Sequence, residues 1–321
     1  MCTAISYKNR YFGRNLDYDI SYGEGITLCP RNFPLTFKEQ PILLSHHAII
    51  GMAIVSDNYP LFFDAINEKG LFMSGLLFPD NAKYFPENPE KINITPFEFI
   101  PYILGKFSSV SEAREEIENI NLLDIPFSKD LPLTPLHWIL SDSNGSLTIE
   151  STKDGLKIYD NPVGVLTNNP PFDFHLHNLS NFIGLSPKDP QNTFSASLPL
   201  RAFSRGMGAI GLPGDFSSQS RFVKACFLKE NSVSGDTEFS DIGQFFHILE
   251  SVSQVRGSVA TKKGGLEITL YSSCCDNERG IYYYKTYDNS SINGVSMLNK
   301  DLNSSSLFSY PLITKSEMKI L

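Results

Sequence analysis

The cysteine at position 2 is the residue of this sequence whose type and place most clearly suggest chemistry. The chain has 321 residues and five cysteines, so a cysteine directly after Met1 is improbable by chance. The alternative interpretation is a small residue that begins a first strand. If Met1 is removed, Cys2 carries both a thiol and a free α-amine. An α-amine titrates at about pH 7.7–8.0, so part of it is neutral at physiological pH and can accept the thiol proton.

Such a nucleophile with its own base favours amide cleavage through an acyl-enzyme, because the same proton can later pass to the leaving nitrogen. Other catalytic systems have little support. The sequence has no G-x-S-x-G and no H-E-x-x-H motif. The histidine pairs at 46–47 and at 175 and 177 lack a convincing third ligand, so we interpret them as surface or packing residues. Residues 211–214 form a glycine-rich turn without the lysine of a phosphate loop. We therefore expect no metal and no organic cofactor.

The composition is that of an ordinary folded protein, with 41% hydrophobic and 19% charged residues. A net charge of −8, without any run of Lys or Arg, argues against nucleic-acid and anionic-membrane partners. No stretch has the length and hydropathy of a membrane span or a secretory signal. An odd number of cysteines without CxxC spacing indicates a reducing, cytoplasmic location. We interpret Cys226, Cys274 and Cys275 as buried structural thiols.

The elements that must position Cys2 are predominantly strands at both ends of the chain. Strand patterns follow one another up to residue 78, and two further strands are predicted after residue 265. Helices are predicted in blocks between them, one of them capped by Ser240. This order is typical of mixed α+β layers, not of alternating βαβ units. We expect one domain over residues 1–321, in which a sheet packs on a sheet and helices lie outside.

The opening of the chain, Met1-Cys2-Thr3 followed by YFGRNLD at 11–17, resembles that of the choloylglycine hydrolase family. This family includes bile salt hydrolases and penicillin V acylases of the N-terminal-nucleophile hydrolase fold. Single segments are weak signals, but their ordered set together with Cys2 is specific. Further matching segments occur at 30–32, 165–170, 172–173, 212–215, 217–218, 220–222, 283–284 and 286–288. The resemblance implies a four-layer αββα sandwich.

The resemblance also implies a role for five residues. Cys2 matches the nucleophile, and Arg14 matches an arginine beside it, where a positive charge favours thiolate. Asp17 matches the aspartate that hydrogen-bonds the α-amine and orients it. Asn168 matches the asparagine whose amide donates into the oxyanion hole, and Arg221 matches a second arginine of the active site.

Arg14 and Asp17 taken alone favour a surface ion pair on a strand. Their separation by three residues puts them on opposite faces of a straight strand. We therefore expect the chain to bend after Asn15 if both residues serve the site.

One position departs from the bile salt hydrolase pattern. These enzymes commonly have asparagine in the segment that here spans 75–79, where this chain has Leu77. The backbone N–H of Leu77 can still donate to an oxyanion, but a polar side-chain contact is lost. Penicillin V acylases also differ from asparagine there, so Leu77 keeps that alternative open.

For the substrate, apolar residues at strand ends and in loops are candidates to line a steroid pocket, among them Phe62, Phe63 and Leu133. Ordinary core packing is the alternative for each. Segment 188–208 corresponds to a hairpin arm that in this family reaches a neighbouring subunit and helps to build tetramers. Its Ser204-Arg205-Gly206 triplet resembles the version found in bile salt hydrolases that favour taurine conjugates. Arg205 could equally serve only to pair with the neighbour.

The sequence therefore predicts an N-terminal cysteine amidase, acting as a homotetramer on conjugated bile salts, a small-molecule substrate, with taurine conjugates preferred. Penicillin V acylase is the alternative enzyme, and acyl transfer to another amine is a possible side activity. The alternative outside enzymes is a bile-acid-binding protein with an inactive site.

Overall fold

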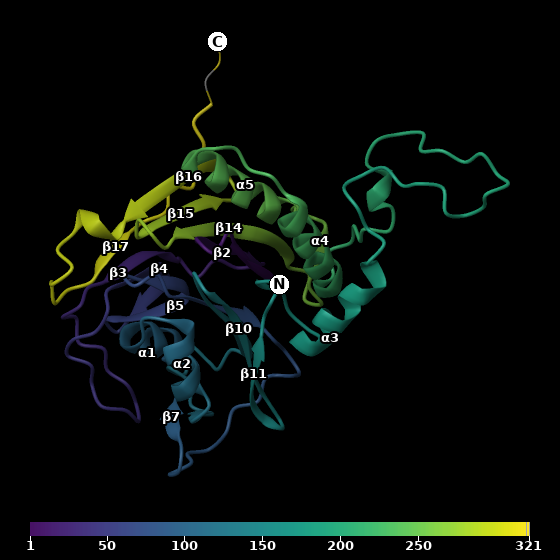
Figure 1. The fold of residues 1–321 in the computed structure, drawn as a ribbon. Coiled ribbons are helices and arrows are strands. Elements are labelled where there is room, and N and C mark those ends of the chain that lie inside the picture. Colours follow the sequence, from purple (N-terminus) through teal and green to yellow (C-terminus); the bar gives the residue numbers. More distant parts are fainter. Residues whose placement is uncertain (319, 321) are drawn as a thin grey trace.

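The computed structural model describes residues 1–318 and 320. Two large β-sheets stack face to face, and helices cover the outer face of each sheet (Figure 1). Helices α4 (Ser218–Asn231) and α5 (Glu238–Glu250) pack on one sheet, and α1 (Phe99–Lys106) and α2 (Val110–Ile117) pack on the other. The predicted α+β sandwich with αββα layers is confirmed.

The first sheet contains the two ends of the chain side by side. Its strand order is β12-β1-β2-β14-β15-β16, with β13 paired to β14, and all neighbours are antiparallel. β2 therefore pairs with β14, which lies at least 250 residues later in the chain, and β1 pairs with β12, about 160 residues later. The strands are β1 (Cys2–Tyr7), β2 (Tyr11–Tyr18), β12 (Val165–Leu166), β13 (Val259–Ala260), β14 (Leu266–Asp276), β15 (Ile281–Thr286) and β16 (Asn289–Ser296).

The second sheet is built mainly from the first half of the chain. Its order is β11-β10-β9-β6-β5-β4-β3-β17, again with antiparallel neighbours, and a separate parallel pair joins β7 and β8. The strands are β3 (Gly25–Cys29), β4 (Ile49–Ser56), β5 (Tyr59–Asn67), β6 (Phe72–Leu77), β7 (Ile92–Ile94), β8 (Ile120–Leu122), β9 (Leu136–Asp142), β10 (Gly145–Thr152), β11 (Gly155–Asp160) and β17 (Phe308–Tyr310).

The remaining helical elements are short. They are α3 (Phe172–Asn178) and the 3₁₀ turns η1 (Leu179–Phe182), η2 (Met207–Ala209) and η3 (Met297–Asn299). The sequence placed the cap of α5 at Ser240, and this is wrong. Thr237 is the N-cap, and its side chain accepts a hydrogen bond from the N–H of Ser240. The helix begins one turn earlier because Thr237 and Ser240 together form a reciprocal capping box.

Apolar side chains fill the space between the sheets. Phe12 of the first sheet stacks on Phe72 of the second, with ring centroids 5.9 Å apart. A second apolar cluster lies between the second sheet and its helices, where Phe99 packs edge-on against the buried Trp138. The site must therefore form where polar side chains interrupt this packing.

The β1–β2 hairpin sets the position of Cys2. Its turn has Lys8 and Asn9 at φ of 53° and 54°, the two positive values that a type I′ turn requires. From this turn the register runs regularly along the pair until Cys2 lies opposite Leu16. Cys2 is thus held at the end of a central strand and is almost completely buried.

Segment 183–206 leaves the body of the molecule as a long loop that doubles back on itself (Figure 1). The N–H of Ser186 donates to the carbonyl of Gly208 at 2.9 Å and closes its base. Within this described segment no helix or strand forms, so the expected hairpin arm has a doubled-back path without strand pairing. Ile183, Phe194 and Phe203 are each more than four-fifths exposed on it.

Over the described residues, 1–318 and 320, none of the helices combines the length and hydropathy required to span a membrane.

Candidate active site

Cys2 and Arg14 lie on one face of the first sheet, and Asp17 lies on the opposite face. Cys2 pairs with Leu16 and Ala4 pairs with Arg14, so Cys2 and Arg14 are diagonal neighbours on the same face. The register stays regular to the end of β1, and the expectation of a bend after Asn15 is wrong. No bend is needed, because the two residues approach Cys2 from opposite sides of its strand.

On the inner face, Arg14 contacts the thiol directly. Its Nη2 donates to Cys2 Sγ at 2.5 Å, and its Nη1 donates to the carbonyl of Gly75 on β6 at 2.5 Å. Nε donates to the carbonyl of Asn15 at 3.2 Å, so three nitrogens of the guanidinium are fixed. Arg14 is 1% exposed. A buried guanidinium that is held in this way stabilises negative charge on sulfur.

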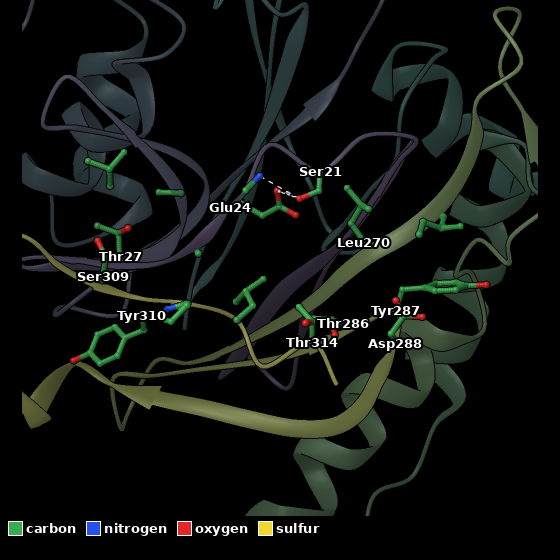
Figure 2. A pocket seen from close by; sticks show the side chains of 17 residues that line it. Ser21, Glu24, Thr27, Leu270, Thr286, Tyr287, Asp288, Ser309, Tyr310 and Thr314 are labelled. Carbon is green, nitrogen blue, oxygen red and sulfur yellow. Dashed lines mark hydrogen bonds between the residues drawn. The ribbon is translucent and has the colours of Figure 1, made fainter. Parts of the chain in front are cut away.

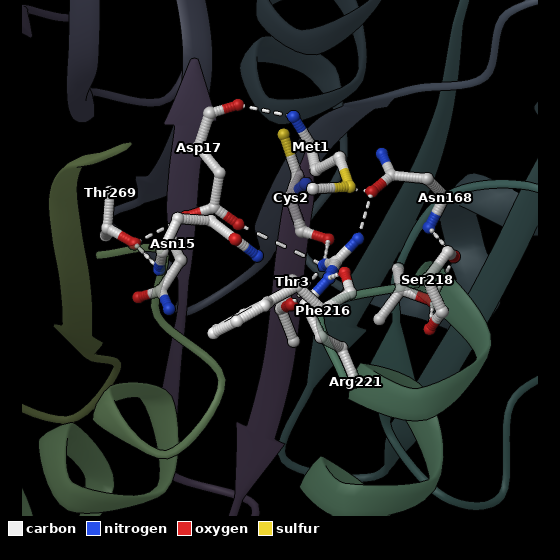
Figure 3. A network of polar contacts seen from close by, with 12 residues as sticks. Met1, Cys2, Thr3, Asn15, Asp17, Asn168, Phe216, Ser218, Arg221 and Thr269 are labelled. Carbon is white, nitrogen blue, oxygen red and sulfur yellow. Dashed lines mark hydrogen bonds and ion pairs between the residues drawn. The ribbon is translucent and has the colours of Figure 1, made fainter. Parts of the chain in front are cut away.

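On the outer face, Arg221 of α4 joins Asp17 to β1 (Figure 3). Arg221 Nη1 lies 4.0 Å from Asp17 Oδ2, donates to Thr3 Oγ1 at 2.6 Å, and also donates to the carbonyl of Cys2. Thr269 Oγ1 donates to Asp17 Oδ1 at 2.6 Å. Burial raises the pKa of Asp17, and the charge of Arg221 opposes that rise. The result is a buried ion pair directly behind the nucleophile.

Asn168 connects the two faces. Its Oδ1 accepts from the Cys2 nitrogen at 2.8 Å and from Arg221 Nη2 at 2.7 Å. Its Nδ2 donates to the carbonyl of Leu77 at 2.7 Å, and its backbone N–H donates to Ser218 Oγ at 2.8 Å (Figure 3). The side-chain amide is therefore fixed at both ends, with its N–H group on the side of Leu77.

Met1 occupies the space next to the nucleophile. Its amino group donates to the carbonyl of Asp17 at 2.5 Å and pairs with Glu267 at 3.1 Å. With Met1 attached, the Cys2 nitrogen is a peptide N–H, whose lone pair is delocalised into the carbonyl. A basic nitrogen at this place, with Asn168 Oδ1 as its partner, requires the removal of Met1.

Cys2 and Arg14 line a cavity of about 480 Å³. Its walls are mostly apolar and include four residues singled out from the sequence, namely Phe62, Phe63, Leu77 and Leu133. Other lining residues are Tyr18, Tyr22, Ile54, Leu61, Pro96, Phe97, Ile100, Phe127, Leu131, Pro132, Leu136 and Trp138. The thiol therefore opens onto a space that suits a bulky apolar acyl group.

Charged groups are scarce in this cavity: the described lining has Arg14, already in contact with the thiol, and Asp130. Ser204 and Arg205 do not line it. They are exposed on the loop 183–206, and the structure does not bring them to the thiol of the same chain.

Two residues near the site were not predicted to have a role there. His175 was interpreted as packing, yet its Nε2 donates to the backbone carbonyl of Asn168 at 3.0 Å. Burial lowers the pKa of His175 to about 4, so the ring is neutral at pH 7. Asp64 is a buried carboxylate that accepts from Tyr271 at 2.6 Å and from Tyr282 at 2.7 Å, across the two sheets. Spacing in the sequence gave no signal for Asp64, because its partners lie more than 200 residues away along the chain. His175 is only seven residues from Asn168, but it bonds a backbone carbonyl, which leaves no side-chain motif.

The remaining cysteines differ from Cys2. Cys226, Cys274 and Cys275 are buried as predicted, and so is Cys29. Burial raises the pKa of all four thiols, which disfavours their thiolates. Cys2 is the one in contact with a guanidinium. Across residues 1–318 and 320, no group of three or more His, Cys, Asp or Glu side chains could hold a metal ion.

A larger cavity of about 600 Å³ lies elsewhere, lined in part by Glu24, Leu270 and Tyr287 (Figure 2). None of the site residues predicted from the sequence lines it. Of these two cavities, the smaller one reaches the thiol.

Known proteins resemble this chain over nearly its full length. A bile salt hydrolase/transferase of Lactiplantibacillus plantarum is 54% identical over 319 residues, which cover 99% of this chain and 98% of the relative. A bile salt hydrolase/transferase of Clostridium perfringens is 40% identical over 317 residues, 97% of this chain and 96% of the relative.

Solved structures agree with this likeness. A mutant of the conjugated bile acid hydrolase of Clostridium perfringens superposes with a TM-score of 0.92 at 38% identity, covering 100% of both chains. The penicillin V acylase of Agrobacterium tumefaciens superposes with a TM-score of 0.75 at 20% identity, covering 98% of this chain and 94% of that one. The second likeness concerns the fold alone.

The model of one protein family, described as linear amide C–N hydrolases of the choloylglycine hydrolase family, matches residues 2–310. The match begins at Cys2 and includes every residue of the buried network except Met1. This chain belongs to the choloylglycine hydrolase family and is an amide hydrolase with the N-terminal-nucleophile fold.

Proposed function

We propose that this enzyme hydrolyses the amide bond of conjugated bile salts, with Cys2 as the nucleophile and with taurine conjugates preferred over glycine conjugates. The observation that carries the proposal is the contact of Arg14 Nη2 with Cys2 Sγ at the wall of a large apolar cavity. Relatives named as bile salt hydrolases, at 54% and 40% identity, support the substrate class.

The reaction begins after removal of Met1. The α-amine of Cys2 accepts the proton from Sγ, and Arg14 stabilises the thiolate. The sulfur attacks the amide carbonyl carbon, and the C=O electron pair moves onto oxygen. As the tetrahedral intermediate collapses, the C–N bond breaks, and the ammonium of Cys2 returns the proton to the leaving nitrogen. A thioester and free taurine or glycine result.

Water then attacks the thioester while the α-amine accepts one of its protons. The C–S bond breaks, the proton returns to sulfur, and the bile acid leaves. The direct hydrogen bond expected between Asp17 and the amine of Cys2 is not formed with Met1 attached: the carboxylate meets Thr269 and Arg221 instead, and the Cys2 nitrogen donates to Asn168 Oδ1. We propose that Asp17 orients the amine through Arg221, which also donates to the carbonyl of Cys2. The oxyanion of both intermediates is stabilised by Asn168 Nδ2 and by the backbone N–H of Leu77.

The cavity lining supports the acyl half of this proposal better than the amine half. A steroid is apolar and rigid, and it loses water-exposed surface against side chains such as Phe62 and Leu133. The sulfonate or carboxylate of the conjugate needs a cation, and Arg14 already contacts the thiol. We propose that Arg205 supplies this cation from the arm of a neighbouring subunit.

A mixed substrate panel tests the proposal. Purified enzyme, its N-terminus verified by intact mass, is incubated with taurocholate, glycocholate and penicillin V together, and products are separated by liquid chromatography. We expect loss of one methionine and release of cholate, faster from the taurine conjugate. Full turnover by protein that retains Met1 would contradict the base assignment, and cleavage of penicillin V alone would contradict the substrate.

Two related activities share the thioester. Penicillin V acylase activity remains the alternative because Leu77 lacks the polar side chain common in bile salt hydrolases. Acyl transfer to an amine in place of water is a second activity that the names of the relatives support. The panel distinguishes these two activities when a free amino acid other than glycine is added as acceptor. Release of the penicillin side chain indicates acylase activity, and a new bile acid conjugate indicates transfer. The alternative of an inactive binding protein is not supported, since the chain belongs to a family of hydrolases.

We further propose that the chain acts as a single functional domain in a homotetramer built through the arm 188–208. The exposed Phe194, Leu200 and Phe203 on that arm support an interface, because large apolar side chains are buried by association. A cytoplasmic location is proposed from the odd set of five cysteines, all of which are free thiols.

A further inference from the structure

His137 is a completely buried histidine on β9 whose ring contacts groups from three directions. Its Nε2 donates to the carbonyl of Thr167 at 2.9 Å, and its Nδ1 shares a hydrogen bond with Glu150 Oε1 at 3.1 Å. The ring of Phe78 stacks on it, with centroids 4.3 Å apart and planes inclined by 5°. Every edge of the imidazole and one of its faces are therefore fixed.

Two of the residues that His137 contacts are adjacent in the chain to the two proposed oxyanion donors. Phe78 follows Leu77, whose backbone N–H is one donor, and Thr167 precedes Asn168, whose side-chain amide is the other. These donors come from segments about 90 residues apart, and Asn168 Nδ2 meets the carbonyl of Leu77 at 2.7 Å. The imidazole of His137 thus contacts both segments, in each case at the residue adjacent to the donor.

Glu150 extends the same arrangement to α3. Its Oε1 also accepts from the N–H of Phe172, the first residue of that helix, at 3.0 Å. The helix carries His175, whose Nε2 donates to the carbonyl of Asn168 at 3.0 Å. Two successive carbonyls, those of Thr167 and Asn168, therefore each accept from a buried imidazole. Glu150 connects these two contacts, because its Oε1 bonds His137 and also the first residue of the helix that carries His175.

An oxyanion hole depends on such support, because its donors must point at a charge that exists only during the reaction. A displacement of about 1 Å can cost on the order of a hundredfold in rate. Neither Leu77 nor Asn168 is held by a covalent or metal link to the other. Direct hydrogen bonds join their segments, from Asn168 Nδ2 to the carbonyl of Leu77 and from Asn169 Nδ2 to the carbonyl of Pro79. The buried contacts of His137 with Thr167 and Phe78 support the same two segments from behind.

We propose that His137, held by Glu150, is a positioning residue that keeps the two halves of the oxyanion hole at working distance. The inference rests on the proposed acyl-transfer chemistry of Cys2, and it assigns His137 no contact with substrate.

The test compares two readouts of Cys2 in His137→Leu. Acylation by a p-nitrophenyl ester passes through an oxyanion, whereas alkylation by iodoacetamide is a displacement that forms none. We expect acylation, and kcat for taurocholate, to fall on the order of ten- to a hundredfold. Alkylation and the KM for taurocholate should stay within about threefold of wild type, which is a difference of under 1 kcal/mol.

His46→Leu is the matched control. His46 is also a buried histidine whose two ring nitrogens meet backbone carbonyls, those of Phe33 and His47, and neither carbonyl belongs to the segments of Leu77 and Asn168. It should lose comparable thermal stability and keep acylation near the wild-type rate. Equal acylation rates in the two variants would overturn the proposal, as would a parallel fall of alkylation and acylation in His137→Leu.

Glu150→Gln provides a second variant if His137→Leu does not fold. Its amide oxygen can still accept from Phe172, so helix α3 keeps its first contact. We expect the same separation of acylation from alkylation, with a smaller loss. Failure of the proposed substrate is distinguishable, because the ester readout requires no bile salt. If the wild-type enzyme does not cleave taurocholate, but His137→Leu still slows acylation by the ester, the proposed substrate is wrong and the positioning role of His137 is supported.

Discussion

The buried centre around Cys2 and the exposed arm, predicted at 188–208 and seen as a loop over 183–206, differ in how the structure holds them. In the centre, Arg14 and Arg221 are each 1% exposed, and their guanidinium nitrogens donate to atoms from several strands. On the arm, Arg205 is exposed and the contacts are local turns, such as the bonds that Asn192 makes with Ser195 and Leu198.

The difference teaches where a single chain defines its own chemistry. A buried cation without partners is very costly, so folding itself enforces the contacts of Arg14 and Arg221. An exposed arginine has no such requirement, and its geometry depends on whatever binds it. The acyl side of the cavity is therefore formed within one chain, whereas the recognition of the amine that we propose for Arg205 would require assembly.

The largest expected effect is at the nucleophile. Cys2→Ala should abolish cleavage of taurocholate, because no other thiol of the chain is in contact with a guanidinium. The fold should persist, since alanine fits at the end of β1. Turnover by liquid chromatography and product binding by calorimetry check both points. Cys226→Ala, at another buried thiol, should keep activity, and more than trace turnover by Cys2→Ala would remove the thiol from the mechanism.

The oxyanion donor comes next. Asn168→Ala should lower kcat by on the order of 10²–10³, the usual loss for one donor. The matched control is Asn161→Ala, because Asn161 is also buried and bonds Thr148 and the carbonyl of Val165, without contact to Cys2. Steady-state kinetics on both variants decide. A folded Asn168→Ala within about threefold of wild type in kcat/KM would show that the amide is structural.

Acid should lower the folding stability contributed by the buried centre and should not change the exposed arm. The folded pKa of His175 is about 4, below the value of about 6.5 in an unfolded chain, because burial disfavours its charged form. Its contribution to stability is complete above pH 6.5 and falls as the pH drops towards 4, by about 1.4 kcal/mol per pH unit.

Urea unfolding at several pH values between 7 and 4 gives the free energy of unfolding as a function of pH. His175→Gln should reduce the slope of this dependence. Gln can still donate to the carbonyl of Asn168 but does not titrate. His177→Gln, at an exposed histidine on the same helix, should leave the slope unchanged. Identical slopes in wild type and His175→Gln would mean that other groups cause the acid sensitivity.

The smallest expected effect is on the arm. Arg205→Ala should reduce a preference for taurocholate over glycocholate that we expect to be several-fold, or roughly 1 kcal/mol in kcat/KM. Taurine ends in a sulfonate that reaches further outward than a carboxylate, so a guanidinium fork at the cavity mouth favours it. Arg201→Ala, at another exposed arginine of the arm, is the control. Equal losses on both substrates would leave Arg205 as a residue of the subunit interface.

The sequence alone was sufficient to predict the layer architecture, which the structure confirms, and to propose the chemistry at Cys2. A thiol and an α-amine on one residue are a nucleophile and a base at a fixed covalent distance, whatever the fold around them. Strand alternation and the order of elements likewise follow from local patterns, and they predicted two stacked sheets with helices outside. The ordered family segments added Arg14, Asp17, Asn168 and Arg221, which the structure brings into one network.

Tertiary structure decided what lies on each side of β1 and β2. The predicted bend after Asn15 was unnecessary, because the partners of Asp17 come from β14 and α4 and reach it on the outer face. His137 and Glu150 showed no motif, since the groups they contact are 13 to 59 residues away along the chain. Contacts of this kind arise only when sheets and helices pack, and the pairing of strands across the sandwich sets their distances. Local sequence predicts the reactive thiol and nitrogen of Cys2, and long-range packing positions the hydrogen-bond donors around them.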